Sequence, residues 1–396
     1  MNIAIIGAGI GGLSTAIALK LAGFDVAVYE RGGEVSDIGA GIVCWPNASF
    51  VLEELGVLDK VSAVSSSVKS MRRFTSEGEA IGLLNINRLS KLMGYPSYAV
   101  LRKDLMKILN QRSIDLGINV FYNHNAKHLA EIKNDKAEVL FENNKHISAD
   151  IILGADGRMN SIARKFILKN HKPIYQGFIN WIGVFESNKS LFSERSVLDF
   201  WGVGERFGIV PVSDKKAYWA GGVASEKLQD KNRSLYKMEL NSVFKTWSKL
   251  IANIIDKTPT SSINKIYVHD HNPIQKWYKN NVLLIGDAAH APLPTSGQGA
   301  CQALEDAWHL ANCLKDNNAD IEQVFSQFSL KRMNKTSGIT IGGRQLASSI
   351  FNSDPEFCSQ RNIISKQTNY AEAVNGMAKG WSSGLPMKTY SVKASL

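Results

Sequence analysis

A glycine-rich turn near the start of the chain constrains its fold more than any other feature. Residues 3–6 (IAII) form a continuous apolar run typical of a buried parallel strand, and a G-x-G-x-x-G pattern follows at positions 7 to 12. Apolar residues then recur at every fourth position, which predicts a helix, until residues 25–30 (DVAVYE) return to the pattern of a strand. A strand, a glycine turn, a helix and a second strand within the first 30 residues make a βαβ unit.

Each glycine of this turn has a physical reason if the turn holds a dinucleotide. Gly7 allows the tight turn, Gly9 lacks the Cβ that would keep a pyrophosphate away from the backbone, and Gly12 lets helix and strand pack closely. The helix N-terminus offers unpaired N–H groups and a partial positive charge to the phosphates. Glu30, at the end of the second strand, can accept hydrogen bonds from ribose hydroxyls. The plainer alternative is a glycine-rich turn without a ligand.

A second segment, residues 154–157 (GADG), follows another buried apolar strand. It runs through Ser161 and Arg164 into a predicted helix. Asp156 is a candidate ligand-binding residue, and the structural alternative is that it caps this helix.

A third segment, residues 286–290 (GDAAH), follows the apolar strand NVLLI. Asp287 therefore stands at the carboxyl end of a strand, where open α/β sheets bind their ligands. Pro292 and the stretch 294–299 then lead into a predicted helix. That helix start is a second possible anion site, suited to the electron-rich end of a flavin.

The order of the predicted elements suggests two interleaved domains. Further predicted elements are helices at 46–60 and 100–116, a hairpin running into a buried strand at 137–154, and a strand, turn and helix at 281–315. Between about 172 and 275 the pattern changes to short, aromatic-rich strands around one Lys-rich helical stretch near 233–256. We infer one nucleotide-binding domain assembled from separate segments and interrupted by a second domain.

Together, the glycine turn with Glu30 and the segments 154–157 and 286–299 resemble the three fingerprints of the FAD-dependent aromatic hydroxylases, the single-component flavoprotein monooxygenases. The resemblance covers residues 1 to about 340 in order and spacing. It implies that Glu30 binds the adenosine ribose, and that Asp287 binds the ribose or ribitol on the flavin side. It also implies that Asp156 serves both FAD and NAD(P)H, that Arg102 lies near the pyrophosphate, and that the turn 294–299 borders the isoalloxazine ring. The expected cofactor-binding residues are Gly7, Gly9, Gly11, Gly12, Glu30, Arg31, Arg102, Asp156, Gly157, Asp287, Pro294, Gly297, Gln298, Gly299 and Ala300.

The resemblance implies an α/β fold with a discontinuous, Rossmann-like FAD-binding domain and an inserted α+β substrate domain. We assign residues 1–75, 97–171 and 276–345 to the FAD-binding domain. The substrate domain takes residues 76–96 and 172–275, and residues 346–396 form a C-terminal helical segment.

The function implied is hydroxylation of a small planar aromatic or heteroaromatic compound with O2 and NAD(P)H, by way of a flavin C4a-hydroperoxide. A second nucleotide fingerprint is missing, so we expect NAD(P)H to dock only transiently. One alternative is an antibiotic-inactivating (tetracycline-type) or epoxidising flavin monooxygenase. An alternative of another class is a non-catalytic flavin-binding sensor or scaffold.

The middle block of the chain, between about residues 172 and 275, is most similar to the urate hydroxylase branch of the family. Asn180, Arg206 and Tyr218 match that branch's substrate-site residues in local context, and we take them as the candidate catalytic residues. Urate is a planar, mostly anionic purine, which an arginine can hold by charge-assisted hydrogen bonds. An asparagine adds a donor and an acceptor, and a tyrosine adds a hydroxyl. Two plainer interpretations stay open: that Arg206 contacts flavin or a surface carboxylate, and that Tyr218 is a strand residue of the core.

Composition excludes several other classes. The net charge is +10, but the basic residues are spread along the chain, so we expect no nucleic-acid partner. The apolar stretch 3–24 is interrupted by glycines and has no basic stretch before it, so we expect neither a signal peptide nor a membrane span. The four cysteines form no C-x-x-C pair, so we expect no metal site, no disulfide framework and a cytoplasmic setting. The chain is expected to be a monomer or a homodimer.

Some polar residues near the motifs receive structural interpretations. We expect His290 to support the loop after Asp287. Glu305 and Asp306 are neighbours on a helix and should point in different directions, so they are not taken as an acid/base pair.

Overall fold

Three segments far apart in the chain lie side by side in the first sheet. The computed structural model describes residues 1–34, 40–133, 136–168, 172–226, 228, 231–316 and 320–387. Within these residues a six-stranded sheet has the order β18-β19-β12-β1-β2-β8, and all neighbours are parallel except β18 and β19. The strand bounds are β1 Asn2–Ile6, β2 Asp25–Tyr29, β8 Asn119–Phe121, β12 Ile151–Gly154, β18 Tyr278–Lys279 and β19 Val282–Leu284.

Parallel pairing brings the carboxyl ends of β1, β12 and β19 to one edge of this sheet. Ile6 is paired with Gly154, and Gly154 is paired with Leu284. The glycine turn, the segment 154–157 and the segment 286–290 therefore begin next to one another. This arrangement confirms the predicted α/β fold with a discontinuous Rossmann-like domain.

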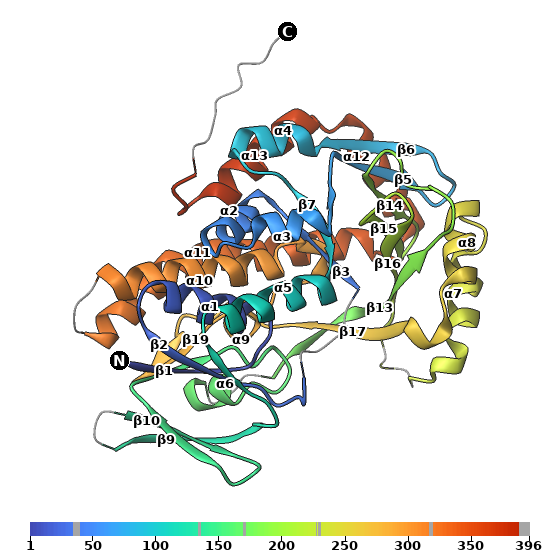
Figure 1. The fold of residues 1–396 in the computed structure, drawn as a ribbon. Coiled ribbons are helices and arrows are strands. Elements are labelled where there is room, and N and C mark those ends of the chain that lie inside the picture. The colour runs from blue at the N-terminus through green and yellow to red at the C-terminus, as the bar shows by residue number, and fades with distance from the viewer. Residues whose placement is uncertain are drawn as a thin grey trace.

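Both faces of the six-stranded sheet are covered, which explains its continuous apolar strands. Helices α1 Ile10–Leu21, α5 Arg102–Asp115 and α10 Gly299–Asp316 lie on one side (Figure 1). On the other side lie α6 Ile162–Ile167 and a three-stranded sheet of β9 Ala126–Lys133, β10 Lys136–Phe141 and β11 His146–Ala149. Side chains such as Ile3, Ile5 and Leu13 are fully buried between these layers.

A second sheet of seven strands has the order β17-β13-β16-β15-β14-β5-β6. Its strands are β5 Ser70–Thr75, β6 Ala80–Asn85, β13 Ile174–Glu186, β14 Ser196–Trp201, β15 Glu205–Pro211, β16 Lys216–Ala224 and β17 Asn264–Asp270. Helices α7 Tyr236–Phe244 and α8 Lys249–Lys257 cover one face around an aromatic cluster that includes Phe207 and Trp219. The other face of this sheet is turned toward a cavity that the next subsection describes.

Two local predictions need correction. The expected boundary at residue 75 is wrong for β5, because this strand pairs with β6 and β14 and so belongs to the seven-stranded sheet. The helix predicted over 46–60 is two helices, α2 Pro46–Glu54 and α3 Leu58–Ala63. Gly56 separates them with a φ of +70°, a backbone conformation that a helix interior excludes.

The C-terminal part of the chain is helical, as predicted, but it does not begin at residue 346. One helix, α11 Ile321–Ile350, runs through that position, and α12 Pro355–Gln367 and α13 Tyr370–Ser382 follow it. Helix α13 packs on β6 and on α4 Ile86–Met93 (Figure 1). Residues 388–396 of the predicted segment lie outside the described residues. Among the described helices, none has both the length and the apolar character needed to cross a bilayer.

The remaining elements connect the two sheets. They are a small sheet of β3 Gly41–Cys44, β4 Ser66–Ser67 and β7 Tyr98–Leu101, and the short helix α9 Asp287–His290.

Candidate active site

A cavity of about 1610 Å³ lies between the carboxyl edge of the six-stranded sheet and the inner face of the seven-stranded sheet. Helices α11 and α13 contribute further wall residues. The predicted site residues that line the cavity are Gly9, Gly11, Arg102, Gly157, Asn180, Arg206, Tyr218, Asp287, Pro294, Gly297, Gln298, Gly299 and Ala300. The structure thus brings together residues predicted from all three motifs and from the middle block.

The glycines at the start of α1 fall into two groups. A Cβ at Gly7 would collide with the carbonyl of Ala155, and a Cβ at Gly12 would collide with the carbonyl of Gly7. These two glycines allow strand, turn and helix to pack against one another. In contrast, a Cβ at Gly9 would meet no atom within 4 Å, and Gly9 faces the cavity. Helix α1 begins with no side-chain cap, so its first N–H groups are available to a bound anion.

Glu30 fastens the glycine turn to the end of β2. Its carboxylate accepts hydrogen bonds from the backbone N–H of Ala8 at 2.7 Å and of Gly32 at 2.8 Å. Glu30 is half-buried beside the cavity rather than in its wall, and Arg31 is exposed. The role of both residues toward a nucleotide stays a prediction.

Asp156 caps the helix that follows it, which is the structural alternative considered for this residue. Its carboxylate accepts hydrogen bonds from the N–H groups of Ile162 at 2.6 Å and Ala163 at 3.2 Å, and from the hydroxyl of Ser161. Burial raises the pKa of Asp156, although these hydrogen bonds oppose the rise. Asp156 does not line the cavity, whereas Ala155 and Gly157 of the same turn do, together with Arg158.

Asp287 stands on the cavity wall as one half of an ion pair. Arg158 donates to its Oδ2 from Nη2 at 2.8 Å and from Nε at 3.2 Å. Burial alone would raise the pKa of Asp287, but the charges of Arg158, His290 and Arg102 outweigh burial and hold the pKa below its usual range. Arg158 was missed at the level of sequence. Its position directly after the GADG turn was the signal that could have indicated it.

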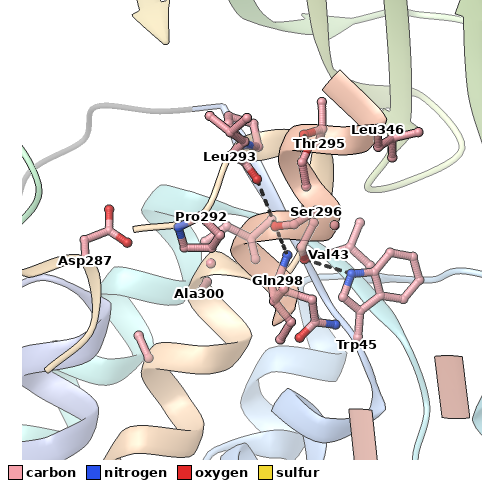
Figure 2. A pocket seen from close by; sticks show the side chains of 18 of the residues that line it. Val43, Trp45, Asp287, Pro292, Leu293, Thr295, Ser296, Gln298, Ala300 and Leu346 are labelled. Carbon is pink, nitrogen blue, oxygen red and sulfur yellow. Dashed lines mark hydrogen bonds between the residues drawn. The ribbon is translucent and has the colours of Figure 1, made fainter. Parts of the chain in front are cut away.

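The turn between Pro292 and Ala300 forms the wall next to Asp287, and Figure 2 shows Asp287 and Trp45 on opposite sides of it. Gly297 has a φ of +63°, and its carbonyl accepts a hydrogen bond from Trp45 Nε1 at 2.9 Å. Ser296 holds the turn from within, because its hydroxyl bonds the carbonyl of Leu293 and the N–H of Gln298. Helix α10 starts at Gly299, so its N-terminus faces the cavity.

A buried ionic network lies behind both the Asp287 loop and this turn. Arg332 of α11 donates to Asp306 at 2.7 Å and to Glu305 at 2.7 Å, and all three side chains are fully buried. Asp306 also accepts the N–H of Gly286 at 2.8 Å and contacts His290 Nε2 at 2.5 Å. Burial raises the pKa of Asp306, but His290 and Arg332 outweigh burial and bring the pKa to about 2. His290 therefore supports its loop as expected, while Glu305 and Asp306 converge on one guanidinium.

Glu305 extends the network to the turn and to the C-terminal helices. Its carboxylate accepts from Asn47 Nδ2 at 2.7 Å, and Asn47 also donates to Gln298 Oε1 at 2.9 Å. Lys335 donates to Glu305 and to the backbone carbonyls of Trp381 and Ser383. The ring of Trp381 lies 5.2 Å from that of Trp45. The end of α13 is thus connected through Lys335 to Glu305, the carboxylate that also binds Asn47 beside the turn.

The three candidate substrate residues lie on the cavity face of the seven-stranded sheet. Asn180 is paired with Gly222 and Gly222 with Arg206, so Asn180 and Arg206 share one row across three strands. A Cβ at Gly222 would collide with Asn180 Oδ1, so the glycine makes room between them. Tyr218 packs over Gly41 of β3, and burial raises its pKa well above the ordinary value.

One plainer interpretation of Arg206 is contact with flavin or a surface carboxylate. The structure agrees with this in part, because Arg206 contacts a carboxylate. Its Nε donates to Asp199 Oδ1 at 2.6 Å, and Asp199 also accepts from Trp201 Nε1 at 2.9 Å. Asp199 is buried rather than on the surface, and it lines the cavity with Arg206.

A family model described as an FAD binding domain matches residues 1–318. The chain belongs to the FAD-dependent aromatic hydroxylases. The match spans the glycine turn, both later motifs and the strands that carry Asn180, Arg206 and Tyr218. FAD is accordingly its cofactor, and the protein is an FAD-dependent monooxygenase of the hydroxylase family.

Similar proteins of known activity cover nearly the whole chain. The protein is 30% identical to the aurachin C monooxygenase/isomerase of Stigmatella aurantiaca, over 87% of this chain and 88% of that protein. It is 28% identical to an FAD-dependent urate hydroxylase of Mycolicibacterium vanbaalenii, over 91% of each chain. A Klebsiella pneumoniae protein solved with FAD and uric acid has a TM-score of 0.89 and 27% identity, over 97% of each chain.

The residues at the sheet edge fit this cofactor. A pyrophosphate needs close backbone approach, which the open side of Gly9 and the uncapped start of α1 allow. A sugar hydroxyl needs a carboxylate acceptor, and Asp287 keeps a side chain 34% exposed on the cavity wall. An electron-rich ring edge needs donors, and the N-terminus of α10 supplies them. These three positions follow one another along the same edge.

Proposed function

We propose that the protein hydroxylates a small planar heteroaromatic substrate with O2 and NAD(P)H, and that urate is the best specific candidate. The observation that carries the proposal is the row of Asn180, Gly222 and Arg206 on the cavity face of the seven-stranded sheet. A planar ring with alternating donors and acceptors needs such a row of fixed polar groups. The relatives named for urate support the choice, because they match the chain over most of its length.

The residues of the sheet would hold and orient the ring. Asp199 fixes the guanidinium of Arg206 through Nε, so its remaining N–H groups have a defined direction. Asn180 offers one acceptor and one donor from the same row. Tyr218 carries its proton on Oη at neutral pH, as an ordinary tyrosine does, and burial raises its pKa further, so its hydroxyl can donate a hydrogen bond.

When bound, FAD would supply the redox chemistry of the reaction, in which NAD(P)H is the reductant, O2 is the oxidant, and one oxygen atom enters the substrate ring while the other leaves as water. The chain's own contribution is to exclude water and to place the ring. Apolar side chains of Ile182, Val197 and Val210 line the cavity between the polar groups. An anionic ring activates its own carbon toward an electrophilic oxygen, and Arg206 would stabilise that anion.

The test is a substrate screen on the purified, FAD-loaded protein. Denaturation should release a yellow flavin, and NAD(P)H consumption should be measured with urate, salicylate, hydroxybenzoates and tetracycline. We expect urate to accelerate NAD(P)H consumption and to yield a hydroxylated product. If another compound of the panel accelerates consumption and urate does not, urate is wrong and that compound class replaces it.

A further inference from the structure

A second arginine, Arg73, lines the same wall of the cavity as Arg206 and has no anionic partner among the described residues. Arg73 lies on β5 and is paired across the strands with Asp199. Its Nε is buried and makes no hydrogen bond. Within the described part of the chain, no carboxylate lies at salt-bridge distance from Arg73. Arg73 as a whole is half-buried, but a buried N–H of a charged group without a partner is unfavourable, so its presence beside a binding site points to a ligand.

The guanidinium of Arg73 is nevertheless held in place. It lies 4.8 Å from the ring centre of Trp201 and 5.8 Å from that of Tyr370. Stacking on aromatic rings fixes the plane of a guanidinium and leaves its N–H edge available for hydrogen bonds. Trp201 is itself fixed, because its Nε1 donates to Asp199.

Another arginine on the same tryptophan shows what a purely structural role looks like. Arg361 of α12 lies 5.3 Å from the ring centre of Trp201. Its N–H groups donate to the backbone carbonyls of Gly202, Ser349 and Ile350. Arg361 therefore closes the end of α11, whereas Arg73 has aromatic contacts and its buried Nε has no hydrogen-bond partner among the described residues.

The charge on this wall is not balanced. Asp199 and Arg206 form an ion pair at 2.6 Å. Among the described residues of this sheet that line the cavity, Asp199 is the one carboxylate, so it is already paired. Arg73 adds a positive charge beside the pair. A neutral substrate would leave this charge uncompensated, whereas a monoanion would neutralise it.

We propose that Arg73 binds the negative charge of the substrate, and that the substrate is a planar aromatic or heteroaromatic monoanion. Arg206, Asn180 and Tyr218 orient the ring and Arg206 also donates to the anion, while Arg73 supplies the positive charge that Asp199 does not already balance. The inference rests on the proposed hydroxylase function and narrows its substrate class. The charge is either a carboxylate on the ring or an ionised ring group, since both are acceptors for an arginine.

The test compares Arg73→Gln and Arg73→Lys with Arg72→Gln in the FAD-loaded protein. Arg72 is a matched control, because the adjacent side chain is 42% exposed and pairs with Glu194 instead. The probes are urate as a ring anion, 3- and 4-hydroxybenzoate as carboxylates, and 4-hydroxybenzamide as a neutral analogue. Binding is followed by the change in flavin absorbance, and KM and kcat by NAD(P)H consumption.

We expect wild type to bind at least one anion more tightly than the amide. Arg73→Gln should raise the Kd and KM of that anion about tenfold, the scale expected for loss of one charged hydrogen bond. Arg73→Lys should restore part of the affinity, and kcat, the Kd for the amide and all constants of Arg72→Gln should change little. An effect of the substitution on urate indicates that Arg73 binds an ionised ring group, whereas an effect on a hydroxybenzoate indicates that it binds a carboxylate.

Three results would overturn the inference: equal loss for anion and amide, an unchanged Kd in Arg73→Gln, or no probe binding to FAD-loaded wild type. Arg73-dependent binding of a hydroxybenzoate together with no response to urate would support Arg73 and remove urate. Protein that cannot hold FAD would count against the function itself, and this outcome is separate from the others.

Discussion

The two walls of the cavity use charged residues in different ways. On the wall of the six-stranded sheet, the carboxylates of Asp287, Asp306 and Glu305 each have a cationic partner within the protein. On the wall of the seven-stranded sheet, Arg73 has no anionic partner among the residues that the structure describes, and its buried Nε makes no hydrogen bond there. A site for a tightly held cofactor can be completed by the protein itself, whereas a site for an exchanging substrate must leave some interactions unmade. The following substitutions test whether FAD binding and substrate binding can be lost independently of each other.

The largest effect should come from the glycine turn. In Gly12→Val, the new side chain would collide with the carbonyl of Gly7, so β1 and α1 could not keep their packing. We expect protein that purifies without flavin absorbance or fails to fold, whatever the substrate. Gly376→Ala on α13 is the control, because a Cβ there meets no atom within 4 Å. Normal flavin content in Gly12→Val would contradict the packing described for this turn.

Next in size is removal of Arg332. Arg332→Leu would leave the buried carboxylates of Glu305 and Asp306 without their main cation. Breaking a buried ion pair on one side typically costs about 3–5 kcal/mol, so the free energy of unfolding in urea should fall by that amount. FAD should also be released more easily, because both loops of the cofactor wall depend on these carboxylates. The control is Arg72→Leu, whose exposed pair should contribute only about 0–1 kcal/mol. Equal losses in the two variants would refute the special role of the network.

A smaller effect should follow on the substrate wall, and it should leave FAD in place. Arg206→Ala should weaken an anionic substrate by about 1.5–3 kcal/mol, the scale of a charged hydrogen bond. The double variant Arg206→Ala with Asp199→Asn separates lost binding from the cost of leaving Asp199 buried alone. Isothermal titration with substrate and the flavin content of the same preparation give both readouts. Loss of flavin in Arg206→Ala would show that FAD binding also depends on the substrate wall, which contradicts the comparison.

The last effect concerns pH and belongs to the cofactor wall. Burial, with help from the charge of Arg332, lowers the pKa of His309 from 6.5 to about 3. Between these values the unfolded chain binds a proton that the folded chain does not, so the stabilising contribution is complete above pH 6.5 and is lost as pH falls toward 3. The free energy of unfolding changes by about 1.4 kcal/mol per pH unit in this range. Between pH 7 and pH 5, the free energy of unfolding of wild type should therefore fall by about 2 kcal/mol more than that of His309→Leu. Urea unfolding at the two pH values measures this difference, and parallel curves would show that His309 titrates normally.

The same contrast explains how much could be predicted from the sequence. The glycine turn and Asp287 were predictable because their roles depend on backbone geometry and on the ends of strands, which local patterns reveal. The contact between Trp45 and Gly297 was not, because the two residues lie 252 positions apart and meet only through the fold. Nor does a local pattern pair Arg332 with Glu305 and Asp306, since these residues come from two different helices.

Arg73 shows why the substrate wall is harder to predict. The sequence places Arg72 and Arg73 next to each other, and strand alternation sends them to opposite faces. Only the register with β14 shows that Arg73 is the one beside Asp199. The expected boundary at residue 75 also hid this strand from the substrate domain.

The strand order has a consequence for how the protein is made. The first strand has a nearby partner in β2, but its other neighbour is β12, through Ile3 and Ile151, and β12 pairs with β19 through Ile152 and Val282, so two strands of the binding edge are synthesised much later. During translation the glycine turn emerges early, yet its binding edge stays incomplete until β19 and the start of α10 have left the ribosome. We therefore expect a nascent chain to bind its yellow cofactor only late in synthesis, and prematurely terminated chains to be colourless.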